Sequence, residues 1–285
     1  MLDRNELGAI RDGRSRPGDL ASIVIPHFQT PDLARLCLRA IRRLTDHPYE
    51  VIVVDNHSQD GSLQYLRQVG WIRLIERGPE TEPEAARAHA SAMDAGLAAA
   101  RGRWLVSFHT DTFVRRRGWL GAMLARLKAE PRAAALGSEK LESGPHWYQA
   151  MKRVWDERRL KNAFRRLVGL AAKPQRTAAD WYPRSYCALY RLDEVRRLGL
   201  NFQPAPGHPA GELLYRGLVA AGFTGIRLPP DEMRKFLDHV AHATALLARG
   251  GLGHWRGNRK VRAALRRLMG SELARELLSD DALDR

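Results

Sequence analysis

An uninterrupted aliphatic run at residues 51–54 (Val-Ile-Val-Val) constrains the fold of this chain most strongly. A strand that is apolar on both faces suits a parallel sheet, in which helices cover both sides. Three further strand-like runs lie at residues 21–26, 71–75 and 103–108, and amphipathic helix patterns separate them. Strands that alternate with helices predict βαβ units, so we expect a Rossmann-like α/β fold with a mainly parallel central sheet flanked by helices.

The regular alternation of strands and helices ends after residue 138, which suggests how the 285 residues are organised. We expect residues 1–20 to form a flexible arm and residues 21–245 to form one α/β domain. Within that domain, residues 138–180 are expected to be a helical insert. Residues 246–285 then form a basic amphipathic helical segment, because apolar residues recur there at helical spacing among many arginines.

The net charge of +15 is the unusual feature of the composition. It favours anionic partners, namely nucleic acid, an anionic membrane surface or phosphorylated substrates. The basic helix patterns at residues 150–173 and 255–278 fit two interpretations: solvated cationic faces over a buried apolar stripe, or docking on an anionic membrane. No signal segment and no membrane-spanning run is visible, so we expect a cytoplasmic protein, with peripheral attachment to the inner face of the membrane as an alternative.

Two carboxylates follow two of the predicted strands. Asp55 comes directly after the run at residues 51–54, and Asp111 lies three residues beyond the strand at residues 103–108. Ligands of open parallel sheets bind outside the carboxyl ends of the strands. The two carboxylates therefore predict a site for a nucleotide and its metal ion at this edge of the sheet.

Four segments carry a resemblance to a known family. Residues 23–29 (IVIPHFQ), 53–62 (VVDNHSQDGS), 92–97 (AMDAGL) and 108–111 (FHTD) resemble, in order and spacing, the family 2 glycosyltransferases with the GT-A fold. The resemblance extends over residues 21–245. It implies a nucleotide-diphosphate sugar donor, Mg²⁺ or Mn²⁺ as cofactor, and an acceptor side formed by the predicted helical insert.

For the nucleotide, the resemblance implies that Asp55 hydrogen-bonds the base. An ionised carboxylate only accepts hydrogen bonds, and uracil, thymine and guanine offer N–H donors. The alternative for residues 55–62 is a plain loop with a helix cap, and for His89 a solvated helix residue. The other nucleotide-binding candidates are Pro26, Phe28, Ser58, Asp60, His89 and Thr110.

For the metal ion, the resemblance implies Asp111 as the carboxylate that binds Mg²⁺ or Mn²⁺. His109 stands where the family's D-x-D motif has its first carboxylate, so it either contacts the donor or favours a softer ion such as Mn²⁺. His239, in a segment that resembles the family's C-terminal histidine segment, is the third metal candidate. The alternatives are that Asp111 caps the next turn and that His239 is an ordinary histidine.

The predicted catalytic base departs from the family pattern. Members carry an acidic pair in the motif E-D-x-D-L-x-x-R, and here the pair falls on Pro209 and Ala210, which cannot take protons. Glu212 is then the best remaining base and His208 the second candidate. The alternative is that Glu212 pairs with Arg216 one helical turn away.

Together these features predict an inverting glycosyltransferase. It would move a sugar from a nucleotide-diphosphate sugar to a hydroxyl of a glycan or lipid-linked acceptor, as in cell-envelope polysaccharide synthesis. The alternatives are a nucleotidyltransferase of similar fold and a nucleotide-binding pseudo-enzyme. A basic nucleic-acid-binding module is a less favoured alternative, because the sequence shows neither the residue spacing of a zinc finger nor the aromatic signature of an RNA-recognition motif. Against the nucleotidyltransferase, residues 27–31 lack the Gly-rich basic loop that usually holds a triphosphate.

Overall fold

The computed structural model describes residues 19–79, 84–139, 141, 165–170, 181–248 and 255–285. The chain divides into two units, Met1–Leu141 with Tyr182–Arg285, and Glu142–Trp181. The predicted arm at residues 1–20 lies almost wholly outside the described residues, and so does most of the predicted insert at residues 138–180. In the second unit, residues 165–167 form a single helical turn.

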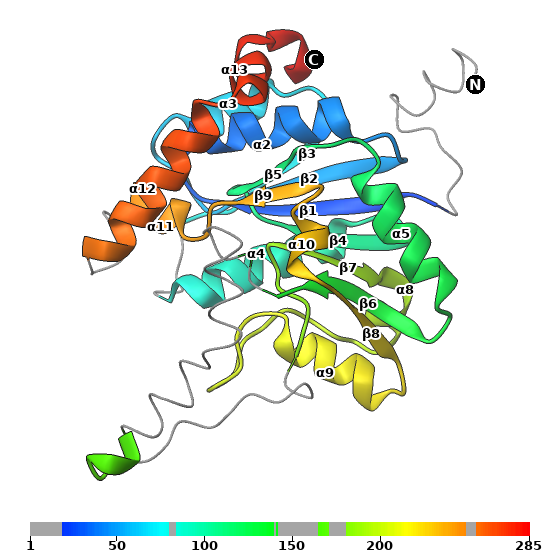
Figure 1. Cartoon of the computed structure of the whole chain (residues 1–285). Helices are drawn as coiled ribbons and strands as arrows, with labels where there is room; N and C mark the ends of the chain where they lie inside the picture. The colour runs from blue at the N-terminus through cyan, green and yellow to red at the C-terminus, as the bar shows by residue number, and fades with distance from the viewer. Residues whose placement is uncertain (1–18, 80–83, 140, 142–164, 171–180, 249–254) are drawn as a thin grey trace. The chain divides into compact units, whose positions relative to one another are not determined.

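Seven strands of the described residues form one central sheet, in the order β3-β2-β1-β4-β7-β6-β8 (Figure 1). The first four strands pair in parallel, β7 runs antiparallel to both β4 and β6, and β6 pairs in parallel with β8. This mixed, mostly parallel sheet confirms the predicted α/β fold. The strands are β1 (Ala21–His27), β2 (Tyr49–Asp55), β3 (Ile72–Glu76), β4 (Trp104–Phe108), β6 (Ala133–Ser138), β7 (Cys187–Arg191) and β8 (Thr224–Leu228).

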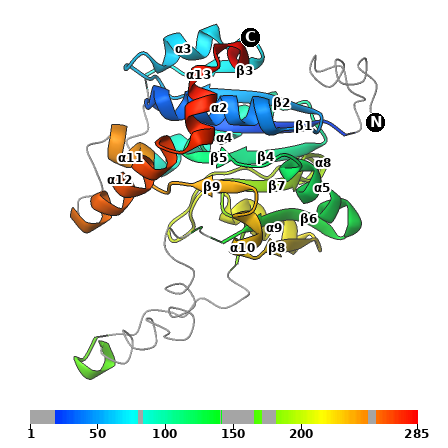
Figure 2. The same ribbon diagram turned by 45° about the horizontal axis from the view of Figure 1, so that its top comes forward.

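Helices cover both faces of this sheet, as the aliphatic run in β2 predicts. Val51 and Val53 pack into one core cluster and Ile52 and Val54 into the other, because successive side chains of a strand point to opposite faces. Figures 1 and 2 show α2 on one face and α4 and α9 on the other. The helices with long buried stripes are α2 (Pro31–Leu44), α4 (Ala85–Ala99), α5 (Trp119–Ala129) and α9 (Glu212–Ala220). The shorter ones are α3 (Ser62–Gln68), α8 (Leu192–Arg197), α10 (Pro230–Met233) and α11 (Ala243–Ala248).

A second, two-stranded sheet lies beside the carboxyl end of β4. It joins β5 (Thr112–Val114) to β9 (Leu237–His239) in antiparallel register, with Thr112 opposite His239. The backbone N–H of Val240 also donates to the carbonyl of Asp111 at 2.9 Å. This small sheet therefore brings a segment near the end of the domain to the turn that follows β4.

The C-terminal segment consists of α12 (Trp255–Met269), α13 (Glu272–Ser279) and the 3-10 turn Asp281–Asp284. α13 and the 3-10 turn pack on α2, and α12 packs on α11 and α13 (Figure 2). The guanidinium of Arg39, on α2, is 1% exposed. It donates to the carbonyls of the last turn of α13 and to Asp281 and Asp284. A buried charge is tolerated only when it is paired and hydrogen-bonded in this way. None of the helices in the described part of the chain has the length and apolarity needed to span a bilayer.

Candidate active site

A cavity of about 780 Å³ opens at the carboxyl ends of β1 and β4. This is the edge of the sheet at which the sequence predicts ligand binding. Arg184 adds a cationic group to its wall. Among the described residues that line it, one carboxylate, Asp111, faces five histidines, which are His27, His89, His109, His239 and His242. The cavity is thus rich in nitrogen donors and poor in negative charge.

Backbone pairing places Asp111 next to His239, although the two are far apart in sequence. β4 ends at Phe108, and a tight turn through His109 leads into β5, in which Thr112 donates from its hydroxyl to the carbonyl of Tyr186 at 3.1 Å. Since β5 pairs with β9, the side chain at the end of β9 reaches the same turn.

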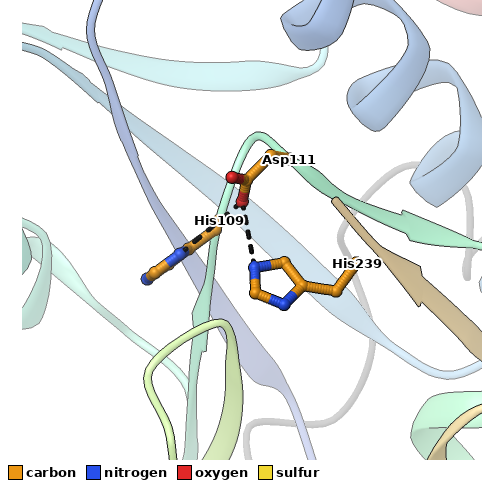
Figure 3. A group of neighbouring side chains, drawn as sticks. All are labelled: His109, Asp111 and His239. Carbon is orange, nitrogen blue, oxygen red and sulfur yellow. Dashed lines mark ion pairs between the residues drawn. The ribbon is translucent and has the colours of Figure 1, made fainter. Parts of the chain in front are cut away.

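The side chains of His109, Asp111 and His239 converge (Figure 3). Asp111 Oδ1 lies 3.3 Å from Nε2 of His239 and 3.7 Å from Nδ1 of His109. Asp111 is 5% exposed, and its Oδ1 makes no hydrogen bond of good geometry. Burial alone raises the pKa of this carboxyl, but the two histidines outweigh burial and hold it well below its usual range. The two histidines therefore favour the ionised form of Asp111.

Three neighbours orient the two histidines. Nε2 of His109 lies 3.1 Å from Oγ of Ser185, and the ring of His239 stacks on the ring of Tyr186 at 4.5 Å and 11°. The ring of His89, on α4, packs edge-on against His109 at 4.8 Å. Burial, aided by His109 and opposed by Asp111, lowers the pKa of His89 to about 3, so this third imidazole is neutral and adds no repulsion.

The donor set fits a divalent cation. Two imidazole nitrogens and a carboxylate oxygen lie within 4.8 Å of one another. Imidazole and carboxylate are the usual protein ligands of divalent transition metals, and the ionised Asp111 supplies negative charge that a cation would neutralise. His109, Asp111 and His239, the three predicted metal candidates, are thus brought together by the fold as one possible metal site.

The predicted nucleotide-binding residues divide into two groups. Pro26, Phe28, His89 and Thr110 line the cavity. Asp55 does not line it, since it is 0% exposed and accepts from both the N–H (2.9 Å) and the hydroxyl (2.6 Å) of Ser58.

Ser58 and Asp60 tie the loops after β1 and β2 together. The backbone N–H of Gln29 donates to Ser58 Oγ at 2.7 Å, and that of Thr30 donates to Asp60 Oδ2 at 2.7 Å. Asp60 also accepts from the N–H and hydroxyl of Ser62, the first residue of α3. Ser58 and Asp60 therefore do not line the cavity themselves but hold the two loops that support its wall.

Several residues of the cavity were not predicted from the sequence. His27 is 1% exposed and neither ring nitrogen has a hydrogen-bond partner. Burial lowers the pKa of His27 to about 4, although Asp55 and Asp60 oppose this shift. Its position between Pro26 and Phe28 was a signal that could have found it. No such signal existed for Arg184, Ser185 and Tyr186, which reach the site because β7 returns antiparallel beside β4.

Comparison with known proteins agrees with this arrangement. The family described as "Glycosyl transferase family 2" matches residues 22–171. The protein belongs to this family. It is a glycosyltransferase with the GT-A fold, and both predictions made from its motifs are confirmed.

Solved structures resemble this glycosyltransferase in fold at low sequence identity. A mannosyltransferase, PcManGT, from Pyrobaculum calidifontis in complex with GDP-Man and Mn²⁺ is 18% identical with a TM-score of 0.52; the match covers 98% of this chain and 86% of that one. Glucosyl-3-phosphoglycerate synthase from Mycobacterium tuberculosis, in complex with Mn²⁺, UDP and glucosyl-3-phosphoglycerate, is 18% identical with a TM-score of 0.49, covering 94% and 85%. The search of curated proteins found no match.

In this glycosyltransferase the predicted base, Glu212, is engaged in an ion-pair network. Its Oε1 accepts from Nδ1 of His208 at 2.9 Å and from Nε and Nη2 of Arg216 at 3.0 and 2.9 Å. Burial raises the pKa of Glu212, but His208 and Arg216 lower it more, so the carboxylate is a weaker base than usual. Pro209 and Ala210 line the cavity, whereas Glu212 and His208 are not among its lining residues. This geometry favours the pairing with Arg216 that the sequence left open.

Proposed function

We propose that this glycosyltransferase moves a sugar from a nucleotide-diphosphate sugar to a hydroxyl of a glycan or lipid-linked acceptor, with inversion and with the help of a divalent metal ion. The proposal rests above all on the convergence of His109, Asp111 and His239 in the cavity at the strand ends. The Pyrobaculum mannosyltransferase was solved with GDP-Man and Mn²⁺, which agrees with this kind of donor and ion.

The lining residues suggest how the donor is held. We place the nucleotide against Pro26, Phe28 and Thr110, with Asp55 and Ser58 fixing the wall behind them. The donor's diphosphate lies toward His109, Asp111 and His239, and Arg184 supports it as a charge-assisted donor. A divalent cation held there would stabilise the negative charge that builds on the departing diphosphate.

The transfer itself is a single displacement. The acceptor oxygen attacks the anomeric carbon from the side opposite the diphosphate, and the bond to the diphosphate oxygen breaks as the new glycosidic bond forms. The acceptor proton passes to a base, for which Glu212 remains our candidate. To take that proton, Glu212 has to exchange its bonds to His208 and Arg216 for one to the acceptor.

Calorimetric titration tests the donor site. UDP, GDP and dTDP are each titrated into the wild type and Asp111→Asn, with and without Mn²⁺. We expect metal-dependent binding of one diphosphate that is lost in the variant. Binding of none of the three by the folded wild type contradicts the proposal. Donor hydrolysis that Asp111→Asn abolishes excludes the pseudo-enzyme alternative, whereas tight binding without any turnover supports it.

We also propose peripheral attachment to anionic membranes through the outer face of α12. Its apolar residues Val261 and Leu265 pack into the core, so they are not free to enter a bilayer as one sequence interpretation required. Attachment is then electrostatic and sensitive to salt. The exposed cationic residues of this face are Arg259, Lys260, Arg262, Arg266 and Arg267.

Sedimentation with lipid vesicles tests this attachment. The protein is mixed with phosphatidylserine-containing or pure phosphatidylcholine vesicles at low and high salt. We expect co-sedimentation with the anionic vesicles at low salt only. A charge-reversed variant, Arg262→Glu with Arg266→Glu, should stay in the supernatant. Equal binding to both kinds of vesicle, or none to either, contradicts the proposal.

A further inference from the structure

The possible metal site formed by His109, Asp111 and His239 differs in donor chemistry from the pair of carboxylates in a D-x-D motif. Its ligand atoms are two imidazole nitrogens and one carboxylate oxygen, from His109, His239 and Asp111. Mg²⁺ is a hard ion that prefers oxygen ligands and parts reluctantly with its water. Imidazole nitrogen suits ions such as Co²⁺ and Zn²⁺, whose affinities for nitrogen sites exceed that of Mn²⁺. The donor atoms alone therefore disfavour Mg²⁺.

The spacing of these atoms fits one ion. Asp111 Oδ1 lies 3.3 Å from the nearer nitrogen of His239 and 3.7 Å from that of His109. Two ligands that are each about 2.0–2.1 Å from a tetrahedral ion are roughly 3.3 Å apart. The three atoms all lie within 4.8 Å of one another, so the two nitrogens have to approach each other by side-chain rotation before all three bind one ion.

The surroundings of His109 prepare it as a ligand. Oγ of Ser185, 3.1 Å away, can accept the proton of Nε2, which leaves Nδ1 with the lone pair that faces Asp111. Metal-binding histidines commonly have such a partner on the other ring nitrogen, which fixes the tautomer and the ring orientation. His89 packs against the same ring and limits its rotation. His109 is thus held with Nδ1 toward Asp111.

We propose that His109 makes this site selective for a nitrogen-preferring divalent transition ion, in the order Co²⁺ or Zn²⁺, then Mn²⁺, then Mg²⁺. The inference rests on the proposed metal-assisted function and specifies its ion. A single carboxylate carries half the negative charge of two, so the electrostatic attraction for a hard ion is weaker. The two imidazoles offset this loss only for ions that bind nitrogen well.

Titration of the whole protein with CoCl₂, MnCl₂ and MgCl₂, in the absence of nucleotide, tests the selectivity. Calorimetry measures each affinity, and the visible absorption of Co²⁺ reports nitrogen coordination. We expect the wild type to bind Co²⁺ at least about a hundredfold more tightly than Mg²⁺. His109→Asp, which restores a D-x-D motif, should reduce that ratio by about tenfold or more and shift the Co²⁺ spectrum.

Two further variants keep the test decisive. His47→Asn removes an imidazole at the opposite end of β2 and should behave as the wild type. Ser185→Ala retains all three ligands and should weaken Co²⁺ binding by about tenfold, because the tautomer of His109 is no longer fixed. Should His109→Asp fail to fold, His109→Asn replaces it, and loss of Co²⁺ affinity is then the expected result.

The outcomes separate this inference from the proposed function. Equal affinities for Mg²⁺ and Co²⁺, an unchanged ratio in His109→Asp, or no metal binding at all overturn the selectivity. Nucleotide binding is measured separately with each ion. If a diphosphate binds equally well with Mg²⁺, the selectivity fails and the glycosyltransferase site stands. If Co²⁺ binds selectively and no diphosphate binds, the donor site fails instead.

Discussion

Two buried carboxylates at the same edge of the sheet, Asp55 and Asp111, differ in their hydrogen bonding. Asp55, at the end of β2, accepts hydrogen bonds on both oxygens from Ser58, three residues further along the chain. Asp111, beyond the end of β4, presents Oδ1 to two histidines without a hydrogen bond of good geometry. Both are nearly inaccessible, with exposures of 0% and 5%.

The difference shows what a carboxylate at a strand end is used for. The first is satisfied by its own loop and stabilises the shape of the cavity wall. The second depends on a residue from a distant strand, and its negative charge is available to a cation. An acidic residue after a strand is therefore a structural group when local donors saturate it, whereas one that they leave unsaturated can interact with groups from other parts of the fold.

The largest expected effect is that of Asp111→Asn. The substitution removes the negative charge of the possible metal site and should lower turnover by about a hundredfold or more, since charge stabilisation of the leaving group is lost. Sugar transfer or donor hydrolysis measures this loss, and thermal unfolding checks that the variant folds. If turnover stayed within about tenfold of the wild type, Asp111 would have no important role in the reaction and would not differ from Asp55 in function.

Asp55→Asn should act on stability first. An amide cannot accept from both donors of Ser58 as a carboxylate does, so we expect a loss of about 2–3 kcal/mol in the free energy of unfolding. Urea unfolding of the variant and the wild type measures it. If the variant were as stable as the wild type, the structural role that we assign to Asp55 would be wrong.

The pH dependence of stability tests the environment of His27, which lies beside Asp55. His27, whose Nε2 lies 3.9 Å from Asp55, has a pKa of about 4 in the folded protein against 6.5 as its ordinary value. Between these values the unfolded chain binds the proton and the folded one does not. Stability is therefore fully present above about pH 6.5 and falls as the pH drops toward 4, by at most about 3 kcal/mol.

The matched variant for this effect is His27→Gln, which does not titrate. Urea midpoints of the wild type and the variant are compared from pH 7 to pH 4. We expect the variant to lose less stability over this range. Parallel curves for the two proteins would mean that His27 is not buried as a neutral ring.

The smallest expected effect on stability is that of Glu212→Gln, because this carboxylate has partly exposed partners, His208 and Arg216. We expect a loss of about 1 kcal/mol in the free energy of unfolding. Turnover should fall by about a hundredfold or more, as removal of a general base causes. A drop of less than about tenfold in kcat at unchanged melting temperature would leave Glu212 with its pairing to Arg216 alone and remove it as the base.

The sequence by itself determined the alternation of strands and helices and the carboxylates that follow β2 and β4. These features depend on neighbouring residues: the aliphatic run at residues 51–54 reports burial on both faces, and the motif around residues 108–111 identifies the family. It also brought forward His109, Asp111 and His239 as metal candidates, through the resemblance rather than through spacing.

Only the tertiary structure decided which of these groups meet. The pairing of β5 with β9 brings His239 to Asp111, and the antiparallel return of β7 brings Ser185 to His109. It also decided that Asp55 is saturated by Ser58 and that Glu212 is bound by Arg216. The contacts between strands depend on the register and packing of elements far apart in the chain, which local patterns of polar and apolar residues do not encode. The two local pairs are only three and four residues apart, and for them the fold chose between interpretations that the sequence had left open.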